Sequence, residues 1–148
     1  MQKAGFQAHL IAGLAILVAM SAPALAADTA TLTVKVMNVS DKDGDLRVGV
    51  YDQATFVVRG SKPVANEVVP AKAGAMSFTF SLKPGEYGVK VLQDLNRNGK
   101  LDMSMMGMMP AEPYGLSNDA KPTMSGPPWD DAKITLKPGA TAITITLH

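Results

Sequence analysis

Cysteine is absent from the 148-residue sequence, so disulfide bonds and thiol nucleophiles are excluded. Histidine is almost absent as well. The only two are His9 and His148, which excludes a histidine-dependent catalytic triad and a zinc site built on histidines. Neither sign of charge is in large excess, because the sequence has 14 lysines and arginines and 13 aspartates and glutamates. Without a basic patch, we expect no nucleic-acid partner.

The N-terminus has the features of a secretory signal peptide. An apolar run over residues 10–20 is followed by Ala24 and Ala26 at the small-residue positions of a cleavage site. We predict that residues 1–26 are removed and that the mature protein starts at Ala27. The run is shorter than the ~20 residues that a membrane-spanning helix needs, and no cysteine follows it to carry a lipid. We therefore expect a periplasmic or secreted protein without a stable membrane span.

The mature chain, residues 27–148, has the length of a single domain. Apolar and polar residues alternate in about seven short segments that are separated by turn residues, which is typical of strands. We predict an all-β fold, an antiparallel sandwich with one long loop over residues 94–131. The expected strands are residues 31–39, 46–52, 67–69, 75–82, 87–93, 132–136 and 142–147.

Turn residues predict how neighbouring strands are joined. The Asp-Gly pair at residues 43–44 indicates a hairpin between the segments 31–39 and 46–52. The sequence Leu-Lys-Pro-Gly occurs twice, at residues 82–85 and 136–139, each time between two alternating segments. We expect a hairpin corner at both copies.

Four aromatic or apolar side chains are expected to fasten a loop or close an edge of the sandwich. Tyr87 begins a strand two residues after a Pro-Gly turn, which predicts a tyrosine corner: a mostly buried ring whose hydroxyl bonds to backbone of residues 83–85. Phe56 and Val58 are expected to close an edge of the sandwich. Trp129, the only tryptophan, is expected to hold the long loop against the sandwich rather than to stack on a ligand.

Residues 94–102 have the D-x-[DN]-x-[DN]-G pattern of a calcium-binding loop. Short side chains at alternate positions of a tight turn point inward together, and Gly99 permits the sharp reversal of the backbone. The expected Ca²⁺ ligands are Asp94, Asn96, Asn98, the carbonyl of Lys100, Asp102 and Glu112. Glu112 is included because the twelfth position of the motif, normally a glutamate, is Met105 here. The alternative is a turn whose Asp and Asn side chains cap their own backbone.

Four motifs in this order resemble an exported bacterial family, the domain of unknown function 2141. They are LKPGEYGV (residues 82–89), DLNRNGKLD (94–102), PAEPYGLSN (110–118) and PPWDDA (127–132). The resemblance covers nearly all of the mature chain and implies an immunoglobulin-like or prealbumin-like sandwich. It implies no activity, because none is established for the family. This chain departs from the family at residues 103–109, where members usually carry polar and aliphatic residues.

Five of the seven residues in the segment 103–109 are methionines. They are Met103, Met105, Met106, Met108 and Met109. Thioether sulfur is a soft ligand suited to Cu(I) or silver. Flexible methionines also fill irregular space between a loop and a core, or form an adaptable surface for a partner. Packing, soft-metal binding and a partner surface are therefore three open interpretations of this segment.

No set of residues indicates a reaction. Acid–base catalysis needs paired carboxylates with shifted pKa values in a cleft. Asp94, Asp102 and Glu112 are available, but no nucleophile accompanies them. We therefore expect a non-enzymatic module with a binding or structural role and an unidentified protein or cell-envelope partner. The alternative is a periplasmic protein that binds Cu(I) on its methionines, and an uncharacterised hydrolase is the third hypothesis.

Overall fold

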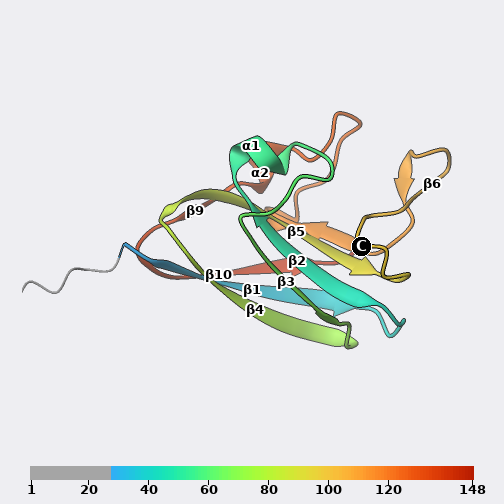
Figure 1. Cartoon of the computed structure of the whole chain (residues 1–148), viewed down its shortest axis with the longest axis horizontal. Coiled ribbons are helices and arrows are strands. Elements are labelled where there is room, and N and C mark those ends of the chain that lie inside the picture. Colours follow the sequence, from blue (N-terminus) through green and yellow to red (C-terminus); the bar gives the residue numbers. More distant parts are fainter. Residues whose placement is uncertain (1–27) are drawn as a thin grey trace, which may run out of the picture.

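The alternating segments form two main sheets that face each other (Figure 1). The computed structural model describes residues 28–148, so the predicted signal peptide, residues 1–26, lies outside the described residues. In the first sheet, β1 (Ala30–Val39) lies between β10 (Gly139–Thr146) and β4 (Gly74–Leu82). β1 runs parallel to β10 and antiparallel to β4.

The second sheet carries the features discussed below. Its order is β3 (Ala65–Pro70), β2 (Asp45–Tyr51), β5 (Gly85–Asp94) and β8 (Tyr114–Leu116). β9 (Ile134–Leu136) pairs with the beginning of β5. All these pairings are antiparallel.

One apolar core lies between the two sheets, because alternate side chains of each strand point inward. Its buried members include Leu32, Val34 and Val36 of β1, Val48 and Val50 of β2, Phe78 and Phe80 of β4, Val89 and Val91 of β5, and Ile145 of β10. The all-β prediction is confirmed, and among residues 28–148 six of the seven strand pairings are antiparallel. The parallel β1–β10 pair joins the two ends of this part of the chain, and strand periodicity does not reveal such a direction.

The predicted hairpin at residues 43–44 is wrong, because β1 and β2 lie in different sheets. Gly44 has φ +136°, and a Cβ atom at this position would lie 2.5 Å from the carbonyl oxygen of Asp94. Glycine therefore lets the chain cross from one sheet to the other in close contact with the end of β5.

The two Leu-Lys-Pro-Gly copies are not hairpin corners either. Residues 82–85 lead from β4 in the first sheet to β5 in the second, and residues 136–139 lead from β9 back to β10 in the first sheet. The two crossings lie together, because Gly85 is paired with Leu136. Alternation looks the same whether the next strand joins the same sheet or the facing one, so the sequence pattern did not separate the two cases.

Gln93 fixes the crossing between β1 and β2. This fully buried amide accepts hydrogen bonds from the backbone N–H and the hydroxyl of Ser40 at 2.9 and 3.0 Å. It also donates to the carbonyls of Ser40 and Lys42 at 3.2 and 3.0 Å. All the hydrogen-bonding capacity of the side chain is therefore used to hold one connection, as a buried polar group requires.

Tyr87 is a tyrosine corner in its hydrogen bond, although its ring is half-buried rather than mostly buried. Its hydroxyl donates to the carbonyl of Lys83 at 3.0 Å, inside the predicted turn. Tyr87→Phe is expected to lower the free energy of unfolding by about 1 kcal/mol, the usual net value of one hydrogen bond. Urea denaturation checks this, and an unchanged midpoint would refute the role of the hydroxyl.

A second apolar cluster covers one end of the outer face of the second sheet. It joins α1 (Gln53–Phe56), α2 (Trp129–Ala132) and β8, with Phe56, Trp129 and Leu116 as buried members. The Phe56 and Trp129 rings meet edge to face with centroids 5.6 Å apart. The anchoring role of Trp129 and the burial of Phe56 are confirmed, whereas Val58 is 51% exposed and closes no edge.

The long segment 94–131 is more regular than predicted. It contains the small hairpin of β6 (Met103–Ser104) and β7 (Met109–Pro110), then β8, the 3₁₀ turn η1 (Ser117–Asp119) and the start of α2. β8 extends the second sheet, and it was missed because a three-residue strand shows too little alternation. Within residues 28–148, no helix has the length and apolarity needed to cross a membrane.

Candidate functional site

The loop at residues 94–102 is held by the carboxylate of Asp94. This side chain is fully buried at the end of β5 and accepts the backbone N–H groups of Asn98 and Gly99 at 3.0 and 2.8 Å. It also accepts Arg47 Nε at 2.6 Å from the neighbouring strand β2. Asp94 thus closes the loop on itself and ties it to the sheet.

The pKa of Asp94 reflects these contacts. Burial by itself raises the pKa of the carboxyl group, but the N–H of Gly99, the Arg47 guanidinium and the N–H of Asn98 outweigh burial and lower the pKa below 3.8. Asp94 is therefore a stable carboxylate at neutral pH, not an acid that is ready to donate a proton.

Three further predicted ligands meet on the exposed side of the loop. The amide nitrogens of Asn96 and Asn98 lie 2.5 and 2.8 Å from Asp102 Oδ2. The amide oxygens of Asn96 and Asn98 accept the backbone N–H groups of Asn98 and Lys100 at 3.1 and 3.0 Å. The side chains at alternate positions therefore converge, and they also cap backbone groups as the alternative interpretation expects.

Glu112 braces the loop from outside it. Its carboxylate is buried and accepts the N–H of Leu95 at 2.9 Å and the N–H of Asp102 at 3.0 Å. These two residues stand at the beginning and the end of the loop, so one side chain fixes the distance between them. Both oxygens already hold a backbone group, which leaves less freedom for the distal metal ligation that the sequence suggested.

The three carboxylates do not form one cluster. Among residues 28–148, no group of three or more His, Cys, Asp and Glu side chains is placed to hold a metal ion. A cation in this loop would therefore depend on the Asn amides and backbone carbonyls together with Asp102 and Asp94. All of these donors are oxygen atoms, which suit a hard ion such as Ca²⁺ and do not suit Cu(I).

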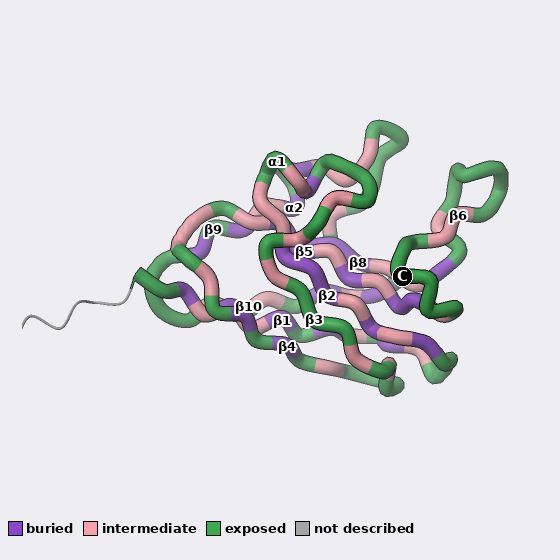
Figure 2. The backbone as a smooth tube through the Cα atoms, viewed as in Figure 1, coloured by how far each residue is buried: buried purple, intermediate pink, exposed green. Residues whose placement is uncertain are grey.

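The methionine segment is exposed. Met105, Met106, Met108 and Met109 expose 70, 97, 71 and 57% of their surface, and Met103 is half-buried at the start of the hairpin. The outward position of this hairpin is visible in Figure 2, where its tip is coloured as exposed. The packing interpretation is therefore wrong for these four residues, because none of them fills space in a core.

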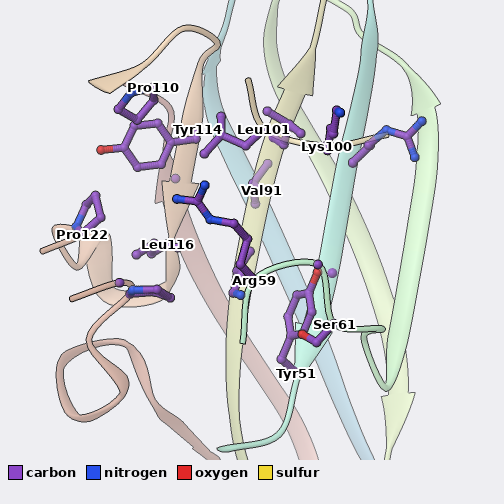
Figure 3. A pocket seen from close by; sticks show the side chains of 18 of the residues that line it. Tyr51, Arg59, Ser61, Val91, Lys100, Leu101, Pro110, Tyr114, Leu116 and Pro122 are labelled. Atoms are coloured by element: carbon purple, nitrogen blue, oxygen red, sulfur yellow. The ribbon is translucent and has the colours of Figure 1, made fainter. Parts of the chain in front are cut away.

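An open groove of about 1110 Å³ runs over the outer face of the second sheet. Arg47 and Tyr51 of β2, Lys90 of β5 and Tyr114 of β8 form its floor. The sides are residues 57–63, the loop 99–110 and residues 122–127. Figure 3 shows the Arg59 side chain reaching over the sheet between Tyr51 and Tyr114.

Lys90 is the functional candidate that the sequence reasoning missed. Its ammonium lies 4.5 Å from the ring centroid of Tyr51 and 4.9 Å from that of Phe56. Burial lowers the pKa of Lys90 to about 8. Alternation in residues 87–93 places Lys90 opposite the inward Val89 and Val91, but only the pairing of β5 with β2 and β8 shows what surrounds it.

The comparisons with known proteins identify a family but add no relative of known activity. The model of the family described as "Uncharacterized protein conserved in bacteria (DUF2141)" matches residues 34–144. Neither the curated proteins nor the solved structures contain a significant match to this chain. The matched segment includes both Leu-Lys-Pro-Gly crossings, the loop 94–102, the methionine hairpin and the groove floor. By this match over most of its length, the chain belongs to the DUF2141 family of bacterial proteins.

Proposed function

We propose that this protein is an exported, non-enzymatic binding module whose loop 94–102 takes up Ca²⁺. The observation that carries the proposal is the convergence of Asn96, Asn98 and Asp102 at one point, above a backbone turn that Asp94 already holds. This is the arrangement that the alternating pattern of a calcium loop serves. In the periplasm or outside the cell, the ion would order a loop that forms one side of the groove.

The donors fit such an ion chemically. Ca²⁺ accepts six to eight oxygen ligands of mixed type, and carboxylate, amide and backbone carbonyl oxygens are all present here. Asn96 and Asn98 would turn their amide oxygens toward the ion, in place of the N–H donors that now contact Asp102. Arg47 already neutralises Asp94, so we expect weak binding, on the order of 10⁻⁴ M or poorer, as in extracellular modules.

A second candidate function is supported by the exposure of the methionine hairpin. Four thioethers stand in solvent on a short two-stranded element, free to reorient around a soft ion. Cu(I) would be bound by sulfur alone, independently of the oxygen donors of the loop. Replacement of all five methionines of residues 103–109 by leucine keeps the apolar volume and would abolish copper uptake.

The test compares thermal melts of the mature protein in millimolar calcium and in chelator, with elemental analysis of protein purified without chelator. Binding to the folded state alone stabilises it by about 2.7 kcal/mol at a hundredfold excess over the dissociation constant. The parent protein should therefore melt higher in calcium. The double variant Asn96→Ala, Asp102→Ala should lose this rise while its melt in chelator changes little, because Asn96 is exposed and Asp102 only half-buried.

Asp43→Ala is the matched control, since Asp43 is an exposed acid of a neighbouring turn outside the loop. It should keep the full calcium response. If the parent protein melts at the same temperature in calcium and in chelator, the calcium proposal is wrong and the loop is a self-capped turn. Copper without calcium in the elemental analysis would favour the methionine hairpin instead.

A further inference from the structure

The groove on the outer face of the second sheet has an uneven charge. Its charged lining consists of Arg47, Arg59, Lys90, Lys100 and Asp102. Arg47 is neutralised by Asp94, and Asp102 lies at the end of the loop beside the two asparagines. What remains toward the middle of the groove is an excess of positive charge from Arg59 and Lys90.

Lys90 stands out among these cations because it is half-buried on the floor. Within residues 28–148, no carboxylate lies within 4.0 Å of its ammonium, whereas Arg47, Arg97 and Lys133 each have an acidic partner. The Tyr51 and Phe56 rings lie close to this ammonium instead. Cation–π contact with the two rings offsets part of the cost of burying this ammonium, but it supplies no countercharge.

Aromatic rings shape the floor around Lys90. The Tyr51 ring lies directly over Gly49, where a Cβ atom would come within 2.7 Å of it. On β5, Gly88 lies two residues before Lys90 and is covered by the Phe56 ring in the same way. Tyr114 stands on the other side of the groove (Figure 3). The floor therefore offers flat apolar surface beside the Lys90 ammonium.

The rim of the groove is apolar and comes from two separate loops. Leu101 lies near the end of the candidate calcium loop, Met103, Met108 and Pro110 follow that loop, and Met124 and Pro127 belong to the segment before α2. Met108 and Met124 are 71 and 100% exposed, so these thioethers have no packing role in this structure. Unbranched, polarizable side chains of this kind adapt to ligands of irregular shape.

We propose that the groove binds a small amphiphilic anion, with its carboxylate or phosphate head between Lys90 and Arg59 and its apolar body along Tyr114 and the methionine rim. The positive floor selects the sign of the head, and the aromatic and thioether surfaces provide contact area for an apolar chain or ring. A bound anion supplies a countercharge for Lys90, which has no acidic partner among residues 28–148. Lys90, Arg59, Tyr114 and the two rings beside Lys90 all lie outside the loop 94–102, so the site goes beyond the calcium proposal and can be tested separately from it.

The test uses decanoate as the probe and isothermal titration calorimetry of the mature protein, in chelator and again in calcium. Saturable binding is expected below the micellar concentration of the probe. Lys90→Met should weaken it by about tenfold or more, the effect of losing one charge-assisted contact. Lys90→Arg should keep most of the affinity. The matched control Lys35→Met removes an exposed lysine from β1 in the other sheet and should leave binding unchanged.

Folding does not confound this comparison. Lys90→Met removes a half-buried charge and places a thioether against the Tyr51 and Phe56 rings, so the variant should melt at or above the temperature of the parent. A well-folded Lys90→Met protein that no longer binds decanoate supports the site. Equal binding by Lys90→Met and Lys35→Met would overturn it.

Binding should also weaken as the pH rises through about 8, where Lys90 loses its proton. Arg47 is paired with Asp94, and burial raises the pKa of Tyr51, so the Tyr51 phenol stays neutral in this pH range. The nearby acids are engaged elsewhere or face solvent: Asp52 caps α1, Asp130 pairs with Lys133, and Asp131 is exposed. The same fall with pH in Lys90→Met would contradict the assignment.

Two further ligands decide the chemical class. Decyltrimethylammonium has the same apolar chain with the opposite charge and should not bind, so equal binding of both probes would overturn the selection for an anion. Vesicles containing phosphatidylglycerol separate a free amphiphile from a lipid surface. Binding to vesicles without binding to decanoate would also overturn the proposal. Because decanoate binding is measured with and without calcium, its failure is distinguishable from failure of the calcium loop.

Discussion

Asp94→Asn is expected to lower the free energy of unfolding by about 3 kcal/mol. The carboxylate is fully buried and holds two backbone N–H groups and the Arg47 guanidinium. An amide keeps the shape but presents an NH₂ group to at least one of these donors, and it leaves Arg47 without a countercharge. Chemical denaturation measures the loss. The loop 94–102 should become the most protease-sensitive part of the variant, since Asp94 closes it.

Asp45→Asn is the matched control, because it removes a carboxylate from a more exposed pair. Asp45 contacts Arg97 at 3.2 Å, and the Arg97 side chain is 53% exposed. Such pairs contribute about 0–1 kcal/mol, so the control should lose much less stability than Asp94→Asn. Equal losses from the two variants would show that the buried bonds of Asp94 do not determine the stability of the loop.

The contribution of Asp94 has a defined pH dependence. Its pKa in the folded state is lowered below 3.8, so its stabilising effect is fully present above that value and is lost as the pH falls through the folded-state pKa. The difference in unfolding free energy between the parent and Asp94→Asn should therefore be constant near neutrality and shrink in acid. If this difference in unfolding free energy does not shrink in acid, the loss of stability in Asp94→Asn comes from the changed shape of the side chain and not from its lost charge.

Phe56→Ala is expected to cost about 3–5 kcal/mol, the range for removing a buried phenylalanine ring. Phe56 is fully buried over Gly88 and contacts Trp129 edge to face. The cavity would open between α1 and α2, and these two helices have few other contacts with the sheet. Hydrogen exchange should show lost protection in α2 and η1 while β1, in the other sheet, stays protected.

Val58→Ala is the control for this change, because Val58 is two residues away and 51% exposed. Its loss should stay within about 0.5 kcal/mol. If Phe56→Ala unfolds the whole chain in one step without prior loosening of α2, the second cluster is part of the main cooperative unit. If α2 loosens first, the end of the groove next to Lys90 can open locally.

Much of the strand structure was predictable because each strand buries one face. In β1, Leu32, Val34 and Val36 alternate with exposed or half-exposed residues, and this two-residue period follows directly from strand geometry. The Tyr87 bond was also predictable, because it spans only four residues to Lys83. Local patterns of this kind need no knowledge of which strands are neighbours.

Pairing between strands was not predictable from the same pattern. The Asp-Gly pair at residues 43–44 and both Leu-Lys-Pro-Gly copies suggested hairpins, yet each carries the chain from one sheet to the other. The inner faces of two facing sheets bury the same kinds of side chain. Alternation therefore indicates that a residue is buried, but it does not indicate which strand the residue packs against.

The candidate sites divide in the same way. The sequence by itself determined that oxygen-bearing side chains of residues 94–102 converge, because their spacing and Gly99 act within one turn, and that methionines fill residues 103–109. Only the tertiary structure decided that Arg47 neutralises Asp94, that Glu112 braces the loop, that the methionines face solvent, and that Lys90 lies against two aromatic rings. These contacts join residues far apart in the chain, so they depend on which strands become neighbours, and local spacing carries no record of that choice.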